Sequence, residues 1–125
     1  MLDLIETRNR HFREACRRVI SRLGAGQEIT PRIVAELAAR EPAPFFYCTF
    51  DYALRCLRVV RHGRLSMRSP RRAAMWAELN SKVAERQALT GESLPEALST
   101  VLSSCGASQF FISPARAYSL VCELL

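Results

Sequence analysis

The sequence predicts an all-α protein of about six helices, arranged as two tandem three-helix repeats that share a core. Two observations support this fold class. Apolar residues recur at three- and four-residue steps in six segments, and one aromatic segment occurs twice, at residues 44–53 and 108–117. In each copy an aromatic pair precedes a Thr or Ser, and an alanine follows four residues later. We therefore expect short extended aromatic segments before the third and the sixth helix, each leading into a helix capped by a hydroxyl.

The similarity continues beyond the aromatic segment at a constant spacing of 64 residues. Identical pairs at this spacing include Glu14 and Glu78, Val19 and Val83, Arg22 and Arg86, Glu28 and Glu92, Pro31 and Pro95, Ala43 and Ala107, Phe46 and Phe110, and Ala53 and Ala117. We expect a single domain over residues 1–125, with repeat 1 at about 4–62, a basic connector at 63–72 and repeat 2 at about 73–125.

The first repeat begins with a cationic amphipathic helix from Leu4 to Leu23. Its apolar face consists of Ile5, Phe12, Ala15, Cys16, Val19, Ile20 and Leu23. The helix should end at Gly24, because glycine adopts the left-handed conformation of a helix C-cap. Its arginines lie mostly off the apolar face, so they form either a solvated surface or a ridge that faces phosphate groups or an acidic partner.

Thr30 and Pro31 predict the start of a short second helix that ends near Arg40. Its expected buried face consists of Ile33, Val34, Leu37 and Ala38. Pro42 and Pro44 prevent the helix from continuing, because a residue before proline is pushed out of the helical region. The aromatic residues that follow should therefore be extended and packed across the helices.

The third helix should run from Phe50 to His62 and end at Gly63. The expected inward positions are Phe50, Ala53, Leu54, Leu57 and Val60. Arg55, Arg58 and His62 follow each other at steps of three and four on the other side, so they should share one exposed face.

In the second repeat, Ser69-Pro70 predicts the start of a fourth helix that ends at Thr90-Gly91. Its core stripe consists of Met75, Trp76, Leu79 and Val83. The fifth helix should begin at Ser93, where Glu96 completes a capping box, and end before Gly106. Its buried positions are Leu98, Val101 and Leu102.

The sixth helix begins at Ser113, with Pro114 in its first turn. Its apolar arc is wide and consists of Ala117, Tyr118, Leu120, Val121, Cys122, Leu124 and Leu125. A helix that is apolar around most of its girth is buried on several sides. We expect residues 113–125 to lie between the two copies or in the interface of a homodimer.

The sequence offers little for catalysis or for metal and cofactor binding. It has no glycine-rich phosphate loop, no paired histidines at metal spacing, and no Ser or Cys with a recognisable base, so we expect neither an enzyme nor a cofactor. The five cysteines, Cys16, Cys48, Cys56, Cys105 and Cys122, are widely spaced and odd in number, which argues against a metal site or a disulfide framework. Free thiols suit a reducing cytoplasm.

The first residues lack the apolar run of a signal peptide, and no stretch approaches the roughly twenty apolar residues that span a bilayer. We expect a soluble cytoplasmic protein that does not enter the membrane.

The net charge of +6 is unevenly distributed along the chain. Up to Arg72 there are fifteen arginines and seven acidic residues, whereas the rest has three basic and five acidic residues. The asymmetry predicts a polyanionic partner, although the preference for Arg over Lys also fits a GC-rich genome. The candidate nucleic-acid-binding residues are Arg13, Arg17, Arg55, Arg58, Arg61, Arg64, Arg68, Arg71 and Arg72.

The arginines of the third helix favour duplex DNA over RNA, because Arg can bond guanine O6 and N7 in the major groove. The second repeat is an internal control, since the positions that match Arg55, Arg58 and Arg61 are Ser119, Cys122 and Leu125. Either the first repeat binds nucleic acid and the second does not, or these arginines are ordinary surface residues. An alternative is that the aromatic residues beside the arginines form a surface on which the bases of single-stranded nucleic acid stack.

A protein–protein interaction or assembly module is the second candidate function. In that case the apolar sixth helix or the arginine face docks an acidic partner, without catalysis. The link between the second and third helices is longer than the turn of a helix-turn-helix motif. We therefore do not assign the protein to the helix-turn-helix superfamily.

The duplicated segment also resembles a pattern, P-A-P-x-F-Y-x-[ST]-x-x-x-A, that occurs in two copies in short, uncharacterised all-helical bacterial proteins. Residues 42–49 with Ala53 fit it closely, whereas residues 107–113 with Ala117 depart from it at both prolines. Such proteins are often encoded near phage or mobile-element genes. The resemblance implies a bacterial cytoplasmic protein in a DNA-related setting, and it implies no functional residue.

Overall fold

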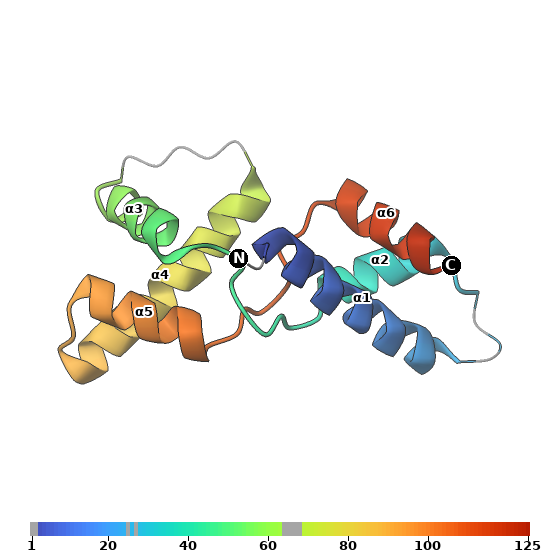
Figure 1. Ribbon diagram of the computed structural model, residues 1–125, viewed down its shortest axis with the longest axis horizontal. Coiled ribbons are helices and arrows are strands. Elements are labelled where there is room, and N and C mark those ends of the chain that lie inside the picture. Colours follow the sequence, from blue (N-terminus) through green and yellow to red (C-terminus); the bar gives the residue numbers. More distant parts are fainter. Residues whose placement is uncertain (1–2, 25, 27, 64–68) are drawn as a thin grey trace. The chain divides into compact units, whose positions relative to one another are not determined.

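The computed structural model describes residues 3–24, 26, 28–63 and 69–125 (Figure 1). These residues form six α-helices and no strand. The helices are α1 (Leu4–Leu23), α2 (Pro31–Ala39), α3 (Phe50–Arg61), α4 (Pro70–Thr90), α5 (Leu94–Ser104) and α6 (Pro114–Leu124). The all-α class and the helix positions that the sequence predicts are confirmed.

Each helix begins at a side chain that accepts a hydrogen bond from a backbone N–H of the first turn. In α3 the Thr49 hydroxyl accepts from Tyr52 N at 3.3 Å, and in α6 the Ser113 hydroxyl accepts from Arg116 N at 3.2 Å. The other caps are Asp3, Thr30, Ser69 and Ser93. Because these caps satisfy N–H groups that have no partner within the helix, they fix where each helix starts.

The six helices form two compact units, each of three helices. Unit 1 comprises Met1–Ala43 and Ser108–Leu125, so it contains α1, α2 and α6. Unit 2 comprises Pro44–Ala107 and contains α3, α4 and α5. Unit 2 is one continuous stretch of chain, and unit 1 is made from the two stretches on either side of it.

These units differ from the tandem grouping that the sequence predicts. The third helix of repeat 1 packs on α4 and α5 of repeat 2, and the third helix of repeat 2 packs on α1 and α2 of repeat 1. The link before each third helix explains why neighbours in sequence are not neighbours in space. Residues 40–49 and 105–113 are non-helical, and an extended link of this length can reach roughly 30 Å, so the third helix need not fold back.

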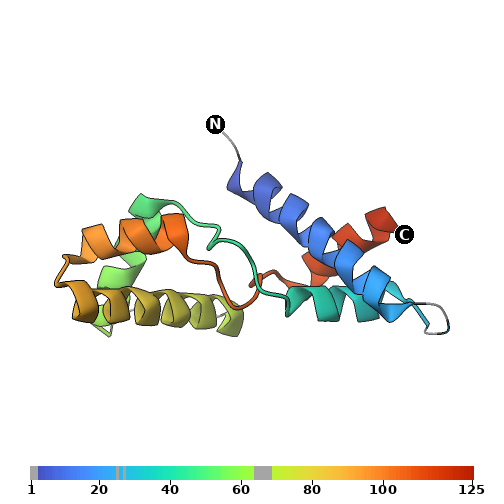
Figure 2. The same ribbon diagram turned by 90° about the horizontal axis from the view of Figure 1, so that it is seen from below.

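In unit 1, α2 packs against both α1 and α6, and α1 crosses α2 (blue and teal in Figure 2). The core residues of α1 are Phe12, Ala15, Cys16 and Val19, which lie on one helical face. The small side chains of Ala35 and Ala38 let the neighbouring helices approach α2 closely. The sequence interpretation of α2 therefore needs correction. Ile33 and Leu37 were expected to be buried, but they are 38% and 40% exposed because the alanines occupy the packed face.

In unit 2, α4 packs along α5, and α3 covers both. Trp76, Leu79 and Val83 form the buried stripe of α4, as the sequence predicts. The Lys82 ammonium lies 5.1 Å from the centre of the Phe46 ring and donates to the Gly106 carbonyl at 2.6 Å. This cation–π contact holds the first aromatic segment against α4.

Burial follows the 64-residue spacing in the two third helices. Ala53, Cys56 and Leu57 are the buried residues of α3, and Ala117, Leu120 and Val121 are those of α6. Phe46 and Phe110 are also both buried. Equivalent residues therefore do equivalent packing in the two units.

The aromatic segments are less extended than the sequence predicts. Cys48 N donates to Phe46 O at 2.9 Å, which makes a three-residue turn centred on Tyr47. The equivalent residue, Phe111, has a φ of 51°, in the left-handed region that aromatic residues rarely adopt. Both segments thus bend at the same position, just before the cap of the third helix.

Two further expectations about individual faces need correction. Phe50, predicted to point inward, is 37% exposed, whereas Cys56 is buried. The wide apolar arc of α6 is buried only along one face, and Tyr118 and Leu125 are exposed. Within the described residues, no helix combines the length and the apolar character that a membrane span requires.

Candidate nucleic-acid interface

The densest positive charge lies in residues 55–72, which we call the arginine segment. It contains seven arginines and no acidic residue, and it lies within unit 2. It begins on α3, passes through residues 62–69 and ends in the first turn of α4. Two of its arginines, Arg64 and Arg68, lie outside the described residues.

Helix α3 presents Arg55 and Arg58 to solvent. Ala53, Cys56 and Leu57 face the core, and the helical period therefore turns both arginines outward. Both side chains are exposed, and no described carboxylate lies within ion-pair distance of either. Their charges are available to an external anion.

Arg61, one turn further on, links α3 to α4. Its Nε donates to the Asn80 side-chain oxygen at 2.9 Å. Because Asn80 is neutral, this bond positions the guanidinium without cancelling its charge. Sequence reasoning did not identify Asn80, since no local pattern connects it with Arg61.

The first turn of α4 carries Arg71, which is half-buried, and Arg72, which is exposed. The Ser69 hydroxyl caps this turn by accepting from Arg72 N at 3.3 Å, and the turn contains no acidic residue. Positive side chains at a helix N-terminus oppose the helix dipole, at a cost of a few tenths of a kcal/mol each. An anion bound nearby would remove this cost.

The other two candidate residues, Arg13 and Arg17, lie on α1 in unit 1. Arg13 pairs with Glu123 of α6 at 3.3 Å, so its charge is already balanced. Arg17 is exposed. Arg55, Arg58, Arg61, Arg71 and Arg72 belong to unit 2, and Arg13 and Arg17 belong to unit 1.

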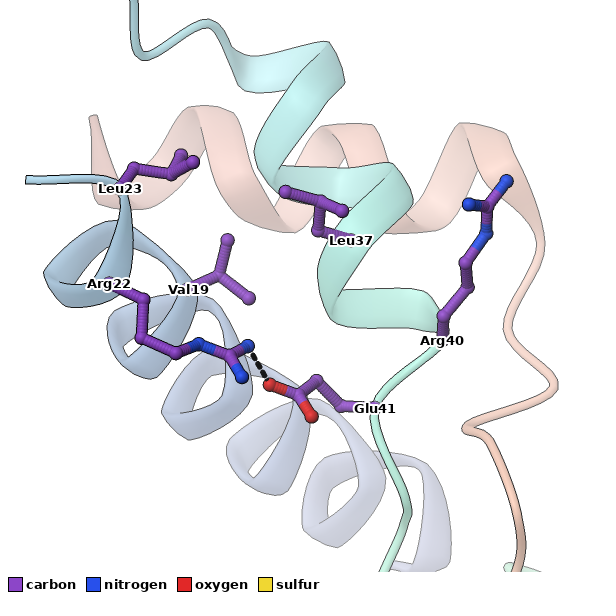
Figure 3. Close-up of a pocket in the computed structure, with 6 residues that line it drawn as sticks. All are labelled: Val19, Arg22, Leu23, Leu37, Arg40 and Glu41. Atoms are coloured by element: carbon purple, nitrogen blue, oxygen red, sulfur yellow. Dashed lines mark hydrogen bonds and ion pairs between the residues drawn. The ribbon is translucent and has the colours of Figure 1, made fainter. Parts of the chain in front are cut away.

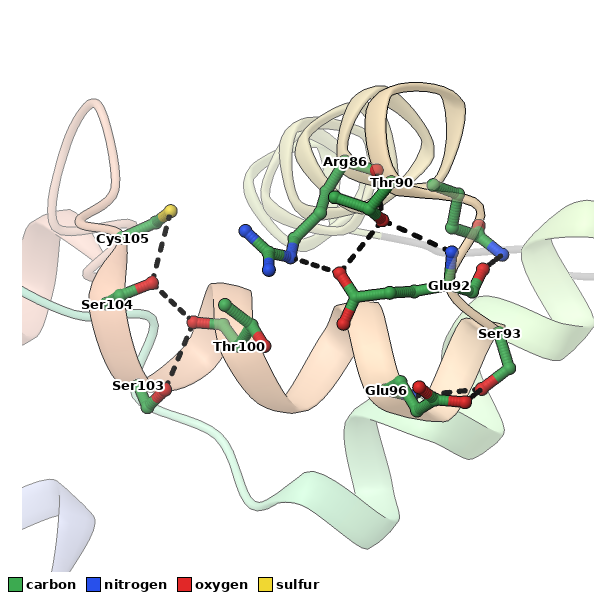
Figure 4. A network of polar contacts seen from close by, with 10 residues as sticks. Arg86, Thr90, Glu92, Ser93, Glu96, Thr100, Ser103, Ser104 and Cys105 are labelled. Carbon is green, nitrogen blue, oxygen red and sulfur yellow. Dashed lines mark hydrogen bonds and ion pairs between the residues drawn. The ribbon is translucent and has the colours of Figure 1, made fainter.

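Several arginines outside the candidate set are held by carboxylates. Arg22 forms an ion pair with Glu41 at the edge of a shallow pocket between α1 and α2 (Figure 3). In unit 2, Arg86 Nε donates to Glu92 at 2.6 Å, and the Thr90 hydroxyl donates to the same carboxylate oxygen (Figure 4). Each pair connects a helix with a link residue, since Glu41 follows α2 and Glu92 precedes α5, so both have a structural role.

Three aromatic side chains near the start of α3 are partly exposed. Tyr52 is 46% exposed and packs edge-on against Trp76, with ring centroids 5.7 Å apart. Phe45 and Phe50 are also partly exposed. Tyr52 is three residues before Arg55, so the two side chains are neighbours along the helix.

Other chemistry finds little support in the described part of the chain. No three His, Cys, Asp or Glu side chains there are grouped as metal ligands would be. All five cysteines are free thiols. Burial raises the pKa of Cys16 and of Cys48 to about 11, so both thiols stay protonated and unreactive at neutral pH.

Comparison of the chain with models of protein families, with curated proteins and with solved structures finds no match.

Proposed function

We propose that this protein binds nucleic acid, with duplex DNA as the preferred form, through the arginine segment of unit 2. One observation carries the proposal: Arg55 and Arg58 are exposed on a capped helix, and neither forms an ion pair with a described carboxylate. Arg61, Arg71 and Arg72 add charge from the same unit. Phosphate contacts of this kind supply the larger part of non-specific affinity for DNA.

The proposal includes Arg64 and Arg68 of the arginine segment and Arg17 of unit 1 as further phosphate contacts. Arg13 of unit 1 joins them only by exchanging Glu123 for a phosphate. Helix α6 is the natural counterpart that lacks these charges. It carries Ser119 and Cys122 where α3 carries Arg55 and Arg58. Unit 2 has nine basic and five acidic residues, and unit 1 has nine and seven, so unit 2 is the more positive unit.

The test compares two double variants that remove the same charge. Arg55→Gln with Arg58→Gln removes two cations from α3, and Arg32→Gln with Arg116→Gln removes two exposed cations from unit 1. Fluorescence anisotropy would follow binding of a short labelled duplex, and of a single strand with the same sequence, at several salt concentrations.

We expect the α3 variant to lose about tenfold or more in duplex affinity and to lower the salt slope by about 2, because each lost phosphate contact removes about 0.9 from the slope. The unit 1 variant should change affinity much less. Equal losses for the two variants would show that only net charge matters and would reject the site. Tighter binding of the single strand would assign the aromatic side chains a stacking role instead.

A protein–protein interaction or assembly module is the second candidate function, because Tyr118 of α6 and Leu125, which follows this helix, are exposed. Truncation of α6 is not a clean test, since Ala117, Leu120 and Val121 hold unit 1 together. Tyr118→Ser with Leu125→Ser keeps the core. If DNA binding survives the α3 changes while dimer formation or partner binding fails in this surface variant, the interaction function is favoured.

We also infer that the chain arose by duplication of a three-helix repeat whose third helices exchanged places. The matching caps at Thr49 and Ser113 and the matching buried residues of α3 and α6 support this inference. A bacterial cytoplasmic setting near mobile DNA, implied by the resemblance of the duplicated segment, remains part of the proposal.

A further inference from the structure

A cavity of about 470 Å³ lies in unit 1 between α2 and the start of α6. Its apolar lining includes Ala35 and Ala39 of α2, Ile112 of the second aromatic segment and Ala117 of α6. The volume falls within the range of cavities that hold small molecules, which are mostly apolar with a few polar groups at fixed positions.

Three charged residues line this cavity, namely Arg32, Glu36 and Arg40, and Arg40 follows the last turn of α2. Its side chain is exposed and has no ion-pair partner in the described ranges. The adjacent Glu41 is engaged by Arg22, and Figure 3 shows the Arg40 guanidinium pointing away from that pair. Arg32, at the other side of the cavity, is balanced by Glu36 at 3.2 Å.

The corresponding positions of unit 2 differ in both size and charge. Phe45 stands where unit 1 has Gln109, and Ser104 stands where it has Arg40. Unit 1 therefore has a smaller side chain, Gln109, and an additional cation, Arg40, at the same site. Neither difference is needed for packing the three helices, since unit 2 folds without them.

We propose that this cavity binds a small carboxylate with an apolar body. The apolar part lies on Ala35, Ala39 and Ile112, and the carboxylate accepts hydrogen bonds from the Arg40 guanidinium. A carboxylate suits this group because the planar guanidinium offers two parallel N–H donors. The site lies in unit 1 and does not involve the arginine segment, so its test is independent of the test for DNA binding.

The experiment titrates the ¹⁵N-labelled full chain with octanoate and with octylammonium, which have the same chain length and opposite charge. We expect saturable shifts of amide signals from α2 and α6 with octanoate. Octylammonium should bind about tenfold more weakly or not at all, because charge-assisted hydrogen bonds to Arg40 are lost. Equal binding of the two probes would overturn the proposal.

Matched variants separate the site from general attraction to a basic protein. Arg40→Gln should weaken octanoate binding about tenfold, whereas Arg10→Gln, which removes the same charge from the exposed face of α1, should not. Gln109→Phe fills the cavity with the residue that unit 2 has and should abolish binding. Ala39→Leu also reduces the volume of the cavity, and it is the alternative variant if Gln109→Phe fails to fold. Unchanged octanoate binding in a folded filling variant, or equal effects of the two arginine changes, would reject the site.

Discussion

The ring of Phe110 lies edge-on against the ring of Phe12, with centroids 5.5 Å apart and planes inclined at 83°. Phe110 N also donates to the Ala39 carbonyl at 3.3 Å. The second aromatic segment is thereby bound to the first two helices of the chain. In unit 2, Phe46 has the equivalent position and is held by Lys82. Each aromatic segment thus anchors the third helix that follows it.

Phe110→Ala should destabilise unit 1 by about 3–5 kcal/mol, the usual cost of removing a buried phenylalanine ring. Hydrogen exchange should accelerate in α1, α2 and α6 and much less in α3, α4 and α5. Phe46→Ala is the matched variant and should give the reverse pattern. If either variant accelerated exchange equally in all six helices, the two units would unfold together and the division into units would be wrong.

Trp76→Phe should change stability by less than about 1 kcal/mol. The Trp76 indole N–H is buried, and no hydrogen-bond acceptor for it lies among the described residues. Trp76→Phe removes this donor, and the stability gained offsets the stability lost with the smaller ring. Phenylalanine also suits the position, because Phe12 is the equivalent residue of unit 1. Trp76→Ala leaves a cavity and should cost about 3–5 kcal/mol. Urea denaturation measures both, and a large loss in Trp76→Phe would show that the indole nitrogen has a partner after all.

Thr49→Ala should cost about 1 kcal/mol, because Tyr52 N loses its acceptor at the start of α3. Ser113→Ala should cost a similar amount at the start of α6. Only the first change should weaken duplex binding, since of these two helices only α3 carries proposed phosphate contacts. Thr49→Ser keeps the acceptor and is the control; a loss of stability as large as that of Thr49→Ala would contradict the capping role.

The free energy of unfolding should fall as pH rises from 9 to 11. Burial raises the pKa of the Cys16 thiol from 9.0 to about 11, and burial together with the nearby Cys56 does the same for Cys48. Between pH 9 and 11 the unfolded chain has released thiol protons that the folded chain still holds, so a rise in pH favours unfolding. Below pH 9 both states hold these protons, and the stabilisation from the raised pKa is fully present. Denaturant titrations of the wild type and of Cys16→Ala with Cys48→Ala measure the effect. A decline equally steep in the variant would assign it to other groups.

Helix positions were predictable from sequence because each helix carries its own local signals. Ser69-Pro70 and Ser113-Pro114 combine a capping hydroxyl with a first-turn proline, and both helices start there. Exposure of Arg55 and Arg58 followed from the same helical period that buries Ala53 and Leu57. These features depend on a few neighbouring residues.

The grouping of the helices was not predictable in this way. Whether α3 packs on α2 or on α4 depends on surfaces far apart in sequence, and both packings bury the same face of α3. The pairing of Arg13 with Glu123 follows from this grouping, because α1 meets α6 only when the third helices are exchanged. The cavity beside Arg40 is missing from the sequence interpretation for the same reason.

The continuous stretch from Pro44 to Ala107 has a consequence for the order of events on the ribosome. Unit 2 can fold as soon as its own residues have emerged, whereas α1 and α2, which are made first, cannot complete unit 1 until α6 has been synthesised. At synthesis rates of about 5–20 residues per second the delay is roughly 4–16 seconds. During that interval the apolar faces of α1 and α2 are uncovered, so these two helices are more exposed to chaperones and to aggregation than unit 2 is.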